Sequence, residues 1–329
     1  AGFPEGWIST RAGSGDTTEV RLKTFDEVFD QLAVSQEFLL VQGEEVSDRF
    51  GRRPIHMCVT NTSSLLTPLG GDSVVQVMQR NVDAALSHRA RTGEAALIHL
   101  NHPDFYVAVT AEQLMQVVGE SFFEVYNGHP AVENMGDTLH ASTDRMWDII
   151  NTWRLSRLDL PLMYGLATDD CHSYHSETSI KDSQPGRGWV MVLSDTLTPD
   201  VLVESLEAGQ FYSSSGVSLE SVTKNDKEFS VTIEGQPDVT YTTDFIGTRK
   251  GFDETSTPAS DDPKEADGVT RRYSEDVGKV LKSVPGSSAT YQFAGDEIYV
   301  RALVTSSRPH PNPGEPGEME RAWVQPVQP

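Results

Sequence analysis

Hydrophobic and polar residues follow two different patterns along this chain, and the change comes near residue 217. Before that point, short apolar runs alternate with stretches that carry apolar residues at helical spacing, which is typical of parallel α/β architecture. After it, apolar runs alternate with polar turns and helical spacing disappears, which favours β-sheets. We therefore expect an α/β domain at residues 1–217 and an all-β, sandwich-like domain at residues 218–329.

Four segments of the first part carry signals for the start of a helix. Three have Thr or Ser followed three residues later by Glu or Gln, the capping-box pattern. The fourth begins at Thr198-Pro199, because proline is favoured at the first helical position. The predicted helices follow residues 24, 73, 110 and 198, and three of them end near Gly93, Gly119 and Gly209.

Apolar segments between these helices predict strands, and polar residues follow most of them. The strands are expected at residues 38–42, 55–59, 96–100, 122–126, 162–167 and 189–193. In parallel α/β folds the loops at the carboxyl edge of the sheet converge and build sites, so we expect a functional site there. Beyond residue 217, strands are expected at 219–222, 229–233, 239–245, 289–293, 298–304 and 322–327, with a long polar excursion at 250–278.

Composition narrows the classes of function. The chain has 26 Lys and Arg against 49 Asp and Glu, a formal charge of -23 that repels phosphate backbones and argues against nucleic-acid binding. No apolar run reaches the roughly 20 residues that a membrane helix needs. Two cysteines, Cys58 and Cys171, are too few for a disulfide framework or a cysteine zinc cluster. The compartment and the oligomeric state are left open.

The most distinctive site pattern is Asp170-Cys171-His172, which follows an apolar strand. Residues two apart in an extended strand point to the same face, so Asp170 and His172 would point together. A carboxylate and an imidazole form a ligand pair suited to zinc, manganese or iron. A hydrogen-bonded Asp–His pair at a strand end fits the same spacing.

A second pattern is Asn101-His102-Pro103. Pro103 ends the strand and presents His102 at its rim. His99 lies three positions earlier and so on the opposite face, which favours a structural role or a place behind the ligands. Asn101 is a further candidate for holding a ligand or substrate.

Other candidates lie on or after neighbouring strands. In Gly43-Glu44-Glu45 one of the two carboxylates must point inward and could bind a metal. Two solvated carboxylates in a loop explain the same sequence equally well. His56 opens an apolar strand, where a core or surface histidine is an equally good interpretation. Glu124 and Asn127 can hydrogen-bond ligands or substrate, and an ordinary strand that runs into an Asn-Gly turn explains them as well.

Taken in order, these motifs resemble the PHP family, named for polymerase and histidinol phosphatase. The resemblance covers roughly residues 20–216, and residues 186–192 and 202–216 look like the closing strand and helix of such domains. It implies a distorted (β/α)7 barrel that holds up to three divalent ions, zinc, manganese or iron, at the strand ends. By motif, Glu45 matches a metal-bridging carboxylate, and His56 and His102 match ligands that share its metal. Asp170 and His172 match ligands of two further ions.

The chain departs from the family pattern at its start. The family begins with His-x-His on its first strand and Asp-His on its second, and neither motif is present. The sequence opens with Ala-Gly-Phe-Pro, without a starting Met or a signal peptide, so we expect a trimmed or incomplete product. Because one β/α unit has about 30 residues, about 60 residues of the barrel are expected upstream. We therefore expect a barrel without its first strands, with weak metal binding and little activity.

The resemblance implies a metal-dependent hydrolase, specifically a phosphoesterase that uses a metal-bridging hydroxide on a small-molecule substrate. Arg187 would hold the substrate phosphate and His175 would protonate the leaving group, although both also fit exposed surface positions. One alternative is a metal-dependent hydrolase of esters or carbamates. Another is a catalytically degenerate binding protein whose β-domain recognises a glycan or a partner. Segments of that domain resemble those that follow PHP barrels in some bacterial proteins.

Overall fold

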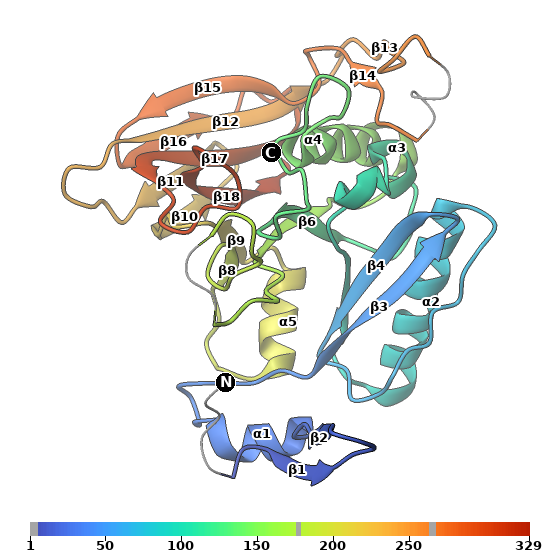
Figure 1. Ribbon diagram of the computed structural model, residues 1–329. Helices are drawn as coiled ribbons and strands as arrows, with labels where there is room; N and C mark the ends of the chain where they lie inside the picture. Colours follow the sequence, from blue (N-terminus) through green and yellow to red (C-terminus); the bar gives the residue numbers. More distant parts are fainter. Residues whose placement is uncertain (1–5, 176–178, 263–267) are drawn as a thin grey trace.

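The computed structural model describes residues 6–175, 179–262 and 268–329 (Figure 1). The chain is a mixed α/β structure in which 19% of residues are helical and 34% lie in strands of several sheets. The predicted (β/α)7 barrel is wrong, because such a barrel needs more helices than the described residues form. Among the described residues, no helix combines the length and the apolar character needed to cross a membrane.

A five-stranded sheet with the order β3-β4-β5-β6-β7 forms the framework of the first part. Its strands β5, β6 and β7 are parallel, whereas β3, β4 and β5 pair antiparallel. The bounds are β3 (Gly43–Phe50), β4 (Arg53–Thr60), β5 (Leu97–Leu100), β6 (Phe122–Asn127) and β7 (Tyr164–Thr168). Two of the four strand pairings in this sheet are therefore antiparallel, and only β3 and β4 are joined by a direct reversal of the chain.

A tight turn explains why the barrel pattern fails. β3 and β4 are joined by Gly51 and Arg52 alone, and Gly51 adopts a left-handed conformation with φ of 60°. Two-residue turns of this kind join antiparallel neighbours, whereas a parallel crossover needs a dozen or more residues. The strand predicted at residues 38–42 is also wrong, because β3 begins only at Gly43. Glu45 consequently lies within a strand and not in the loop after one.

Helices cover one face of this sheet. α2 (Val74–Thr92) follows its predicted cap, where the Ser73 side chain accepts a hydrogen bond from the Gln76 backbone, and it ends at Gly93. α3 (Ala111–Leu114) is a single short turn of helix. α4 (Thr143–Trp153) was not predicted from the sequence and continues into a π-helical turn, η2 (Arg154–Leu158). The apolar core between helices and sheet includes Ile55, Met57, Met78, Phe123 and Trp147, all fully buried.

The amino-terminal segment stays outside this core. The hairpin of β1 (Ser9–Ala12) and β2 (Thr18–Arg21) lies beside α1 (Phe25–Leu32) at one end of the molecule (Figure 1). The predicted capping box of α1 forms between Thr24 and Glu27, but no residue of the helix is buried. The local signal thus specifies the helix without specifying a packing partner.

The other face of the five-stranded sheet packs against α5 (Pro199–Glu207), β8 (Trp189–Val192) and β9 (Phe211–Ser214). Their shared core contains Leu97, Phe122, Leu166, Val203 and Phe211. β8 and β9 also belong to a six-stranded sheet with the order β15-β12-β17-β18-β9-β8. That sheet therefore crosses the boundary expected after residue 217.

The remaining strands build the carboxyl-terminal part. A three-stranded sheet, β10-β11-β16, shares an apolar core with the six-stranded sheet through residues such as Phe229, Phe245 and Val300. The strands are β10 (Leu219–Lys224), β11 (Glu228–Ile233), β12 (Tyr241–Arg249), β13 (Ser256–Thr257), β14 (Arg272–Tyr273), β15 (Lys279–Pro285), β16 (Ser288–Gln292), β17 (Glu297–Pro309) and β18 (Met319–Val327). β13 and β14 form a short pair within the polar excursion.

Candidate metal centre

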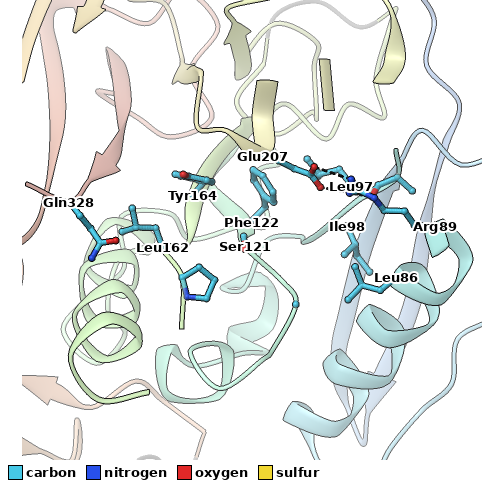
Figure 2. A pocket seen from close by; sticks show the side chains of 13 residues that line it. Leu86, Arg89, Leu97, Ile98, Ser121, Phe122, Leu162, Tyr164, Glu207 and Gln328 are labelled. Carbon is cyan, nitrogen blue, oxygen red and sulfur yellow. Dashed lines mark hydrogen bonds and ion pairs between the residues drawn. The ribbon is translucent and has the colours of Figure 1, made fainter. Parts of the chain in front are cut away.

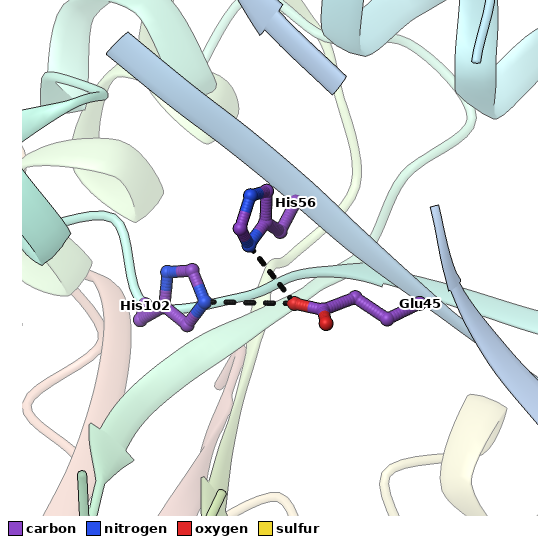
Figure 3. Close-up of side chains that lie close together, drawn as sticks. All are labelled: Glu45, His56 and His102. Atoms are coloured by element: carbon purple, nitrogen blue, oxygen red, sulfur yellow. Dashed lines mark ion pairs between the residues drawn. The ribbon is translucent and has the colours of Figure 1, made fainter. Parts of the chain in front are cut away.

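Three of the predicted ligands meet at the edge of the five-stranded sheet. Glu45 comes from β3, His56 from β4 and His102 from the loop after β5 (Figure 3). The Glu45 Oε1 atom lies 3.0 Å from Nδ1 of His56 and 3.7 Å from Nε2 of His102. The hairpin turn positions the first two residues, because it sets Glu45 and His56 on adjacent antiparallel strands.

The donor set of these three residues fits a divalent transition metal. One ligand atom from each residue lies within 4.8 Å of the others. Bonds of about 2.0–2.1 Å in a tetrahedral site place ligand atoms about 3.3 Å apart, so only small side-chain movements are needed. Two imidazoles and one carboxylate also leave a fourth position open, as in catalytic zinc sites. The Glu45 side chain is 42% exposed, which keeps that side of the cluster accessible.

The carboxylate of Glu124 holds His102 in place. His102 has a φ of 21°, and its backbone N–H donates to Oε2 of Glu124 over 2.7 Å. The same carboxylate accepts hydrogen bonds from Nδ2 of Asn127 at 2.8 Å and from the Thr168 hydroxyl at 2.9 Å. Glu124 and Asn127 therefore act behind the cluster, as a scaffold for the loop that carries His102.

The side chain of Asn101 holds Glu45 in place. Its Nδ2 donates to Glu45 Oε1 over 3.1 Å, and its Oδ1 accepts from the Cys58 backbone N–H over 3.0 Å. The amide thus links the carboxylate of β3 to the backbone of β4. Such supporting contacts orient metal ligands in proteins.

Interactions within the cluster shift the pKa values of Glu45 and His102 in opposite directions. Hydrogen bonds from His102 and then from His56 hold the pKa of Glu45 well below its usual range. Burial alone would lower the pKa of His102, but the hydrogen bond to Glu45 and the charges of Glu124 and Asp170 outweigh it and raise that pKa. The Glu45 carboxylate thus stays ionised between the two imidazole rings, as a carboxylate ligand of a cation must be.

A buried histidine lies directly behind the cluster. Glu45, Cys58 and His99 are cross-strand neighbours, so they point to one face of the sheet. Nε2 of His99 lies 3.5 Å from Oε1 of Glu124, and both side chains are almost fully buried. Burial lowers the pKa of His99, but Cys58 and Glu124 outweigh it and raise the pKa to about 10. His99 thus contacts the scaffold and is separate from the three-residue cluster.

Asp170 and His172 form a second pair rather than joining the first three residues. Nδ1 of His172 lies 3.6 Å from Oδ1 of Asp170 and 2.8 Å from its backbone carbonyl. Asp170 has a left-handed φ of 45°, and its Oδ2 accepts a hydrogen bond from Asn127 over 3.3 Å. Its charge acts on His102. The pair therefore borders the cluster, and His172 is largely exposed.

His129 is a member of this region that the sequence reasoning missed. Its ring centroid lies 5.4 Å from that of His172 and 6.2 Å from that of Phe105, which itself contacts His102 at 4.9 Å. Burial lowers the pKa of His129. The available signal was a histidine two residues after Asn127, at the end of a parallel strand.

Arg187 and His175, the two residues expected to act on the substrate, differ in burial. Arg187 is fully buried, and its guanidinium donates to the carbonyl oxygens of Gly128 and Ser179, each over 2.8 Å. Its charge is thus engaged with the backbone of the loops around the site. His175 is exposed.

A cavity of about 380 Å³ lies elsewhere in the molecule. Leu97, Phe122 and Tyr164 line it at the amino ends of the parallel strands, with Arg89 and Glu207 paired at one side (Figure 2). The cluster of Glu45, His56 and His102 lies instead toward the carboxyl end of β5, where His102 follows the strand.

Comparisons of this chain with models of known protein families, with curated proteins and with solved structures found no match.

Proposed function

We propose that this protein is a metal-dependent hydrolase whose centre is Glu45, His56 and His102. The observation that supports the proposal is the convergence of their donor atoms within 4.8 Å, from three separate segments of the chain. Buried residues keep these ligands in place, since Asn101 contacts Glu45 and Glu124 contacts His102. A fixed and partly open donor set is the arrangement that catalytic metal sites use.

A divalent cation held by these three residues would supply Lewis-acid chemistry and would activate water there. The protein's own groups do the rest. Glu45 and the two histidines would hold the cation. The buried Glu124 carboxylate accepts from the His102 backbone N–H and from Asn127, and these hydrogen bonds would keep His102 in position. Asp170 and His172 border the same cluster, and the charge of Asp170 acts on His102.

We propose a phosphoester as the substrate. The support is the order of motifs along the sequence, which resembles that of PHP phosphoesterases, although the fold is not the barrel that this resemblance implied. An ester or carbamate substrate would use the same centre. A binding protein without turnover would keep the ligands and lack the reaction.

The test is hydrolysis by the whole chain of p-nitrophenyl phosphate, bis(p-nitrophenyl) phosphate and p-nitrophenyl acetate, with added zinc or manganese. We expect slow turnover of a phosphate substrate that disappears with a chelator and in His56→Ala. His140→Ala is the matched control, because His140 pairs with Asp137 outside the cluster. Turnover of the acetate alone would favour an esterase. Metal binding without any turnover would favour the binding protein.

A further inference from the structure

His129 and His172 are neighbouring imidazoles with opposite hydrogen-bond arrangements. Nδ1 of His172 lies 2.8 Å from the backbone carbonyl of Asp170. A carbonyl oxygen only accepts, so this Nδ1 must carry the proton. Nδ1 of His129 instead lies 3.1 Å from the backbone nitrogen of Ala131, which only donates. This Nδ1 must therefore be the unprotonated acceptor.

The two arrangements fix two different tautomers. A neutral imidazole carries one proton, so His172 exposes a bare Nε2 and His129 exposes an Nε2–H. Histidines that bind a metal donate their other ring N–H to a carbonyl or carboxylate, as His172 does. His129 lacks the free lone pair at Nε2 that a metal ligand needs. Its Nε2–H is left to donate a hydrogen bond.

The main chain holds the His129 ring in this orientation. The His129 backbone N–H donates to Oδ1 of Asn127 over 2.8 Å, and Nδ2 of Asn127 donates to Glu124 over 2.8 Å. The carboxylate that fixes His102 thus also anchors the turn that carries His129. Among the described residues, nothing accepts a hydrogen bond from Nε2 of His129.

Ring neighbours connect His129 to the metal cluster. Its ring centroid lies 5.4 Å from that of His172 and 6.2 Å from that of Phe105, and Phe105 lies 4.9 Å from His102 of the cluster. His129 is therefore two ring neighbours away from the residues that would hold the cation and an anionic group bound to it. Uncharged N–H donors aimed at such oxygens stabilise negative charge without competing for the metal.

We propose that His129 is a substrate-binding residue that donates its Nε2–H to an anionic oxygen of a phosphoryl group held at the metal centre. The proposal rests on the proposed function, because the phosphoryl group is bound by the cation in Glu45, His56 and His102. It assigns to His129 a role that differs from that of every other histidine in the region.

The experiment measures zinc and then inorganic phosphate binding to the whole chain by calorimetry, for the native protein, His129→Ala and His129→Gln. Glutamine keeps an N–H donor near the position of Nε2 and serves as the matched variant. We expect all three proteins to bind zinc equally. His129→Ala should bind phosphate about tenfold more weakly in the zinc-loaded state, the effect of losing one hydrogen bond to a charged group. His129→Gln should stay within about threefold of the native protein.

A long-range ¹H–¹⁵N spectrum of the zinc-loaded protein adds a direct measure of the tautomer. The His129 signals, identified by their loss in His129→Gln, should show a protonated Nε2 that shifts when phosphate is added. Unchanged phosphate affinity in His129→Ala with intact zinc binding would overturn the role of His129 alone. Loss of zinc from His129→Ala would make His129 a ligand and also overturn the proposal. A native protein that binds no zinc would overturn the proposed function, and this inference with it.

Discussion

Arg301 and Asp148 form a bidentate ion pair that is almost completely buried between the two parts of the molecule. Nε and Nη2 of Arg301, on β17, donate to the two carboxylate oxygens of Asp148, on α4, each over 2.8 Å. The Tyr299 hydroxyl donates to the same carboxylate at 2.8 Å, and the guanidinium lies 4.8 Å from the ring centroid of Trp147. The pair therefore connects α4 directly to β17.

Replacing Arg301 by alanine should destabilise the protein by about 3–5 kcal/mol, because Asp148 would keep a buried charge without its partner. Urea denaturation measures the loss. Arg157→Ala is the matched control, since the Arg157–Glu254 pair is exposed and should contribute less than about 1 kcal/mol. Equal effects of the two substitutions would show that the buried pair does not hold α4 against β17.

Removing a ligand should abolish tight metal binding. His56→Ala and Glu45→Gln should each weaken zinc affinity by more than about 100-fold, because even groups behind the ligands contribute about 10–100-fold. Calorimetric titration of the whole chain with zinc measures this. His140→Ala should titrate like the native protein. Native-like affinity in His56→Ala would place the ion elsewhere.

Asn101→Ala should have an intermediate effect. The side chain contacts Glu45 without being a ligand, so its loss should weaken zinc binding by about 10–100-fold and leave the stoichiometry unchanged. The same titration measures both quantities. A change in stoichiometry would instead make Asn101 part of the coordination sphere.

Zinc binding should strengthen as pH rises. The pKa of His102 is raised above its usual 6.5 by Glu45, Glu124 and Asp170, in spite of burial, and a cation must displace that proton. Affinity should therefore increase roughly tenfold per pH unit until the pH passes the pKa of His102 in the metal-free protein. Titrations in buffers of different ionisation enthalpy should report proton release. Affinity that is constant over this range would contradict the ion pair.

Glu120 should make the protein less stable as pH rises. Burial raises the pKa of this carboxyl from 4.5 to about 8, so the folded state holds a proton that the unfolded chain releases. Its stabilising contribution is complete below 4.5 and is lost progressively as pH rises toward about 8. Each pH unit in that window should cost up to about 1.4 kcal/mol.

The matched variant for this effect is Glu120→Gln, which cannot ionise. Its unfolding free energy relative to the native protein should improve steadily between about pH 5 and about pH 8. Denaturation curves at several pH values give the difference directly. A difference that does not change with pH would mean that Glu120 ionises in the folded protein as it does in water.

Sequence reasoning was most successful where local chemistry decides the structure. Caps at Thr24 and Ser73 predicted α1 and α2, because a side chain that accepts from a nearby backbone N–H needs no distant partner. The grouping of Glu45, His56 and His102 came from the family resemblance and not from any single stretch, and donor atoms of the three residues do lie within 4.8 Å of one another.

The parts that failed depend on contacts distant in sequence. The Gly51-Arg52 turn pairs β3 with β4, and apolar patterns do not report whether neighbouring strands are parallel. α4 was missed because its Ser142 cap lacks the acidic partner of a capping box. His129 was missed because its significance arises from ring neighbours on other loops. Asp170 and His172 do lie beside each other, as their spacing predicted, and their roles as ligands of two further ions stay predictions.

The position of β9 in the six-stranded sheet has a consequence for how the protein is made. On one side β9 pairs with β8, and on the other it pairs with β18, where Ser214 lies opposite Ala322. A ribosome adding roughly 5–20 residues per second produces β18 many seconds after β9. During that interval the hydrogen-bonding edge of β9 is bare, and the nascent chain is most exposed to mispairing and to chaperones at this strand.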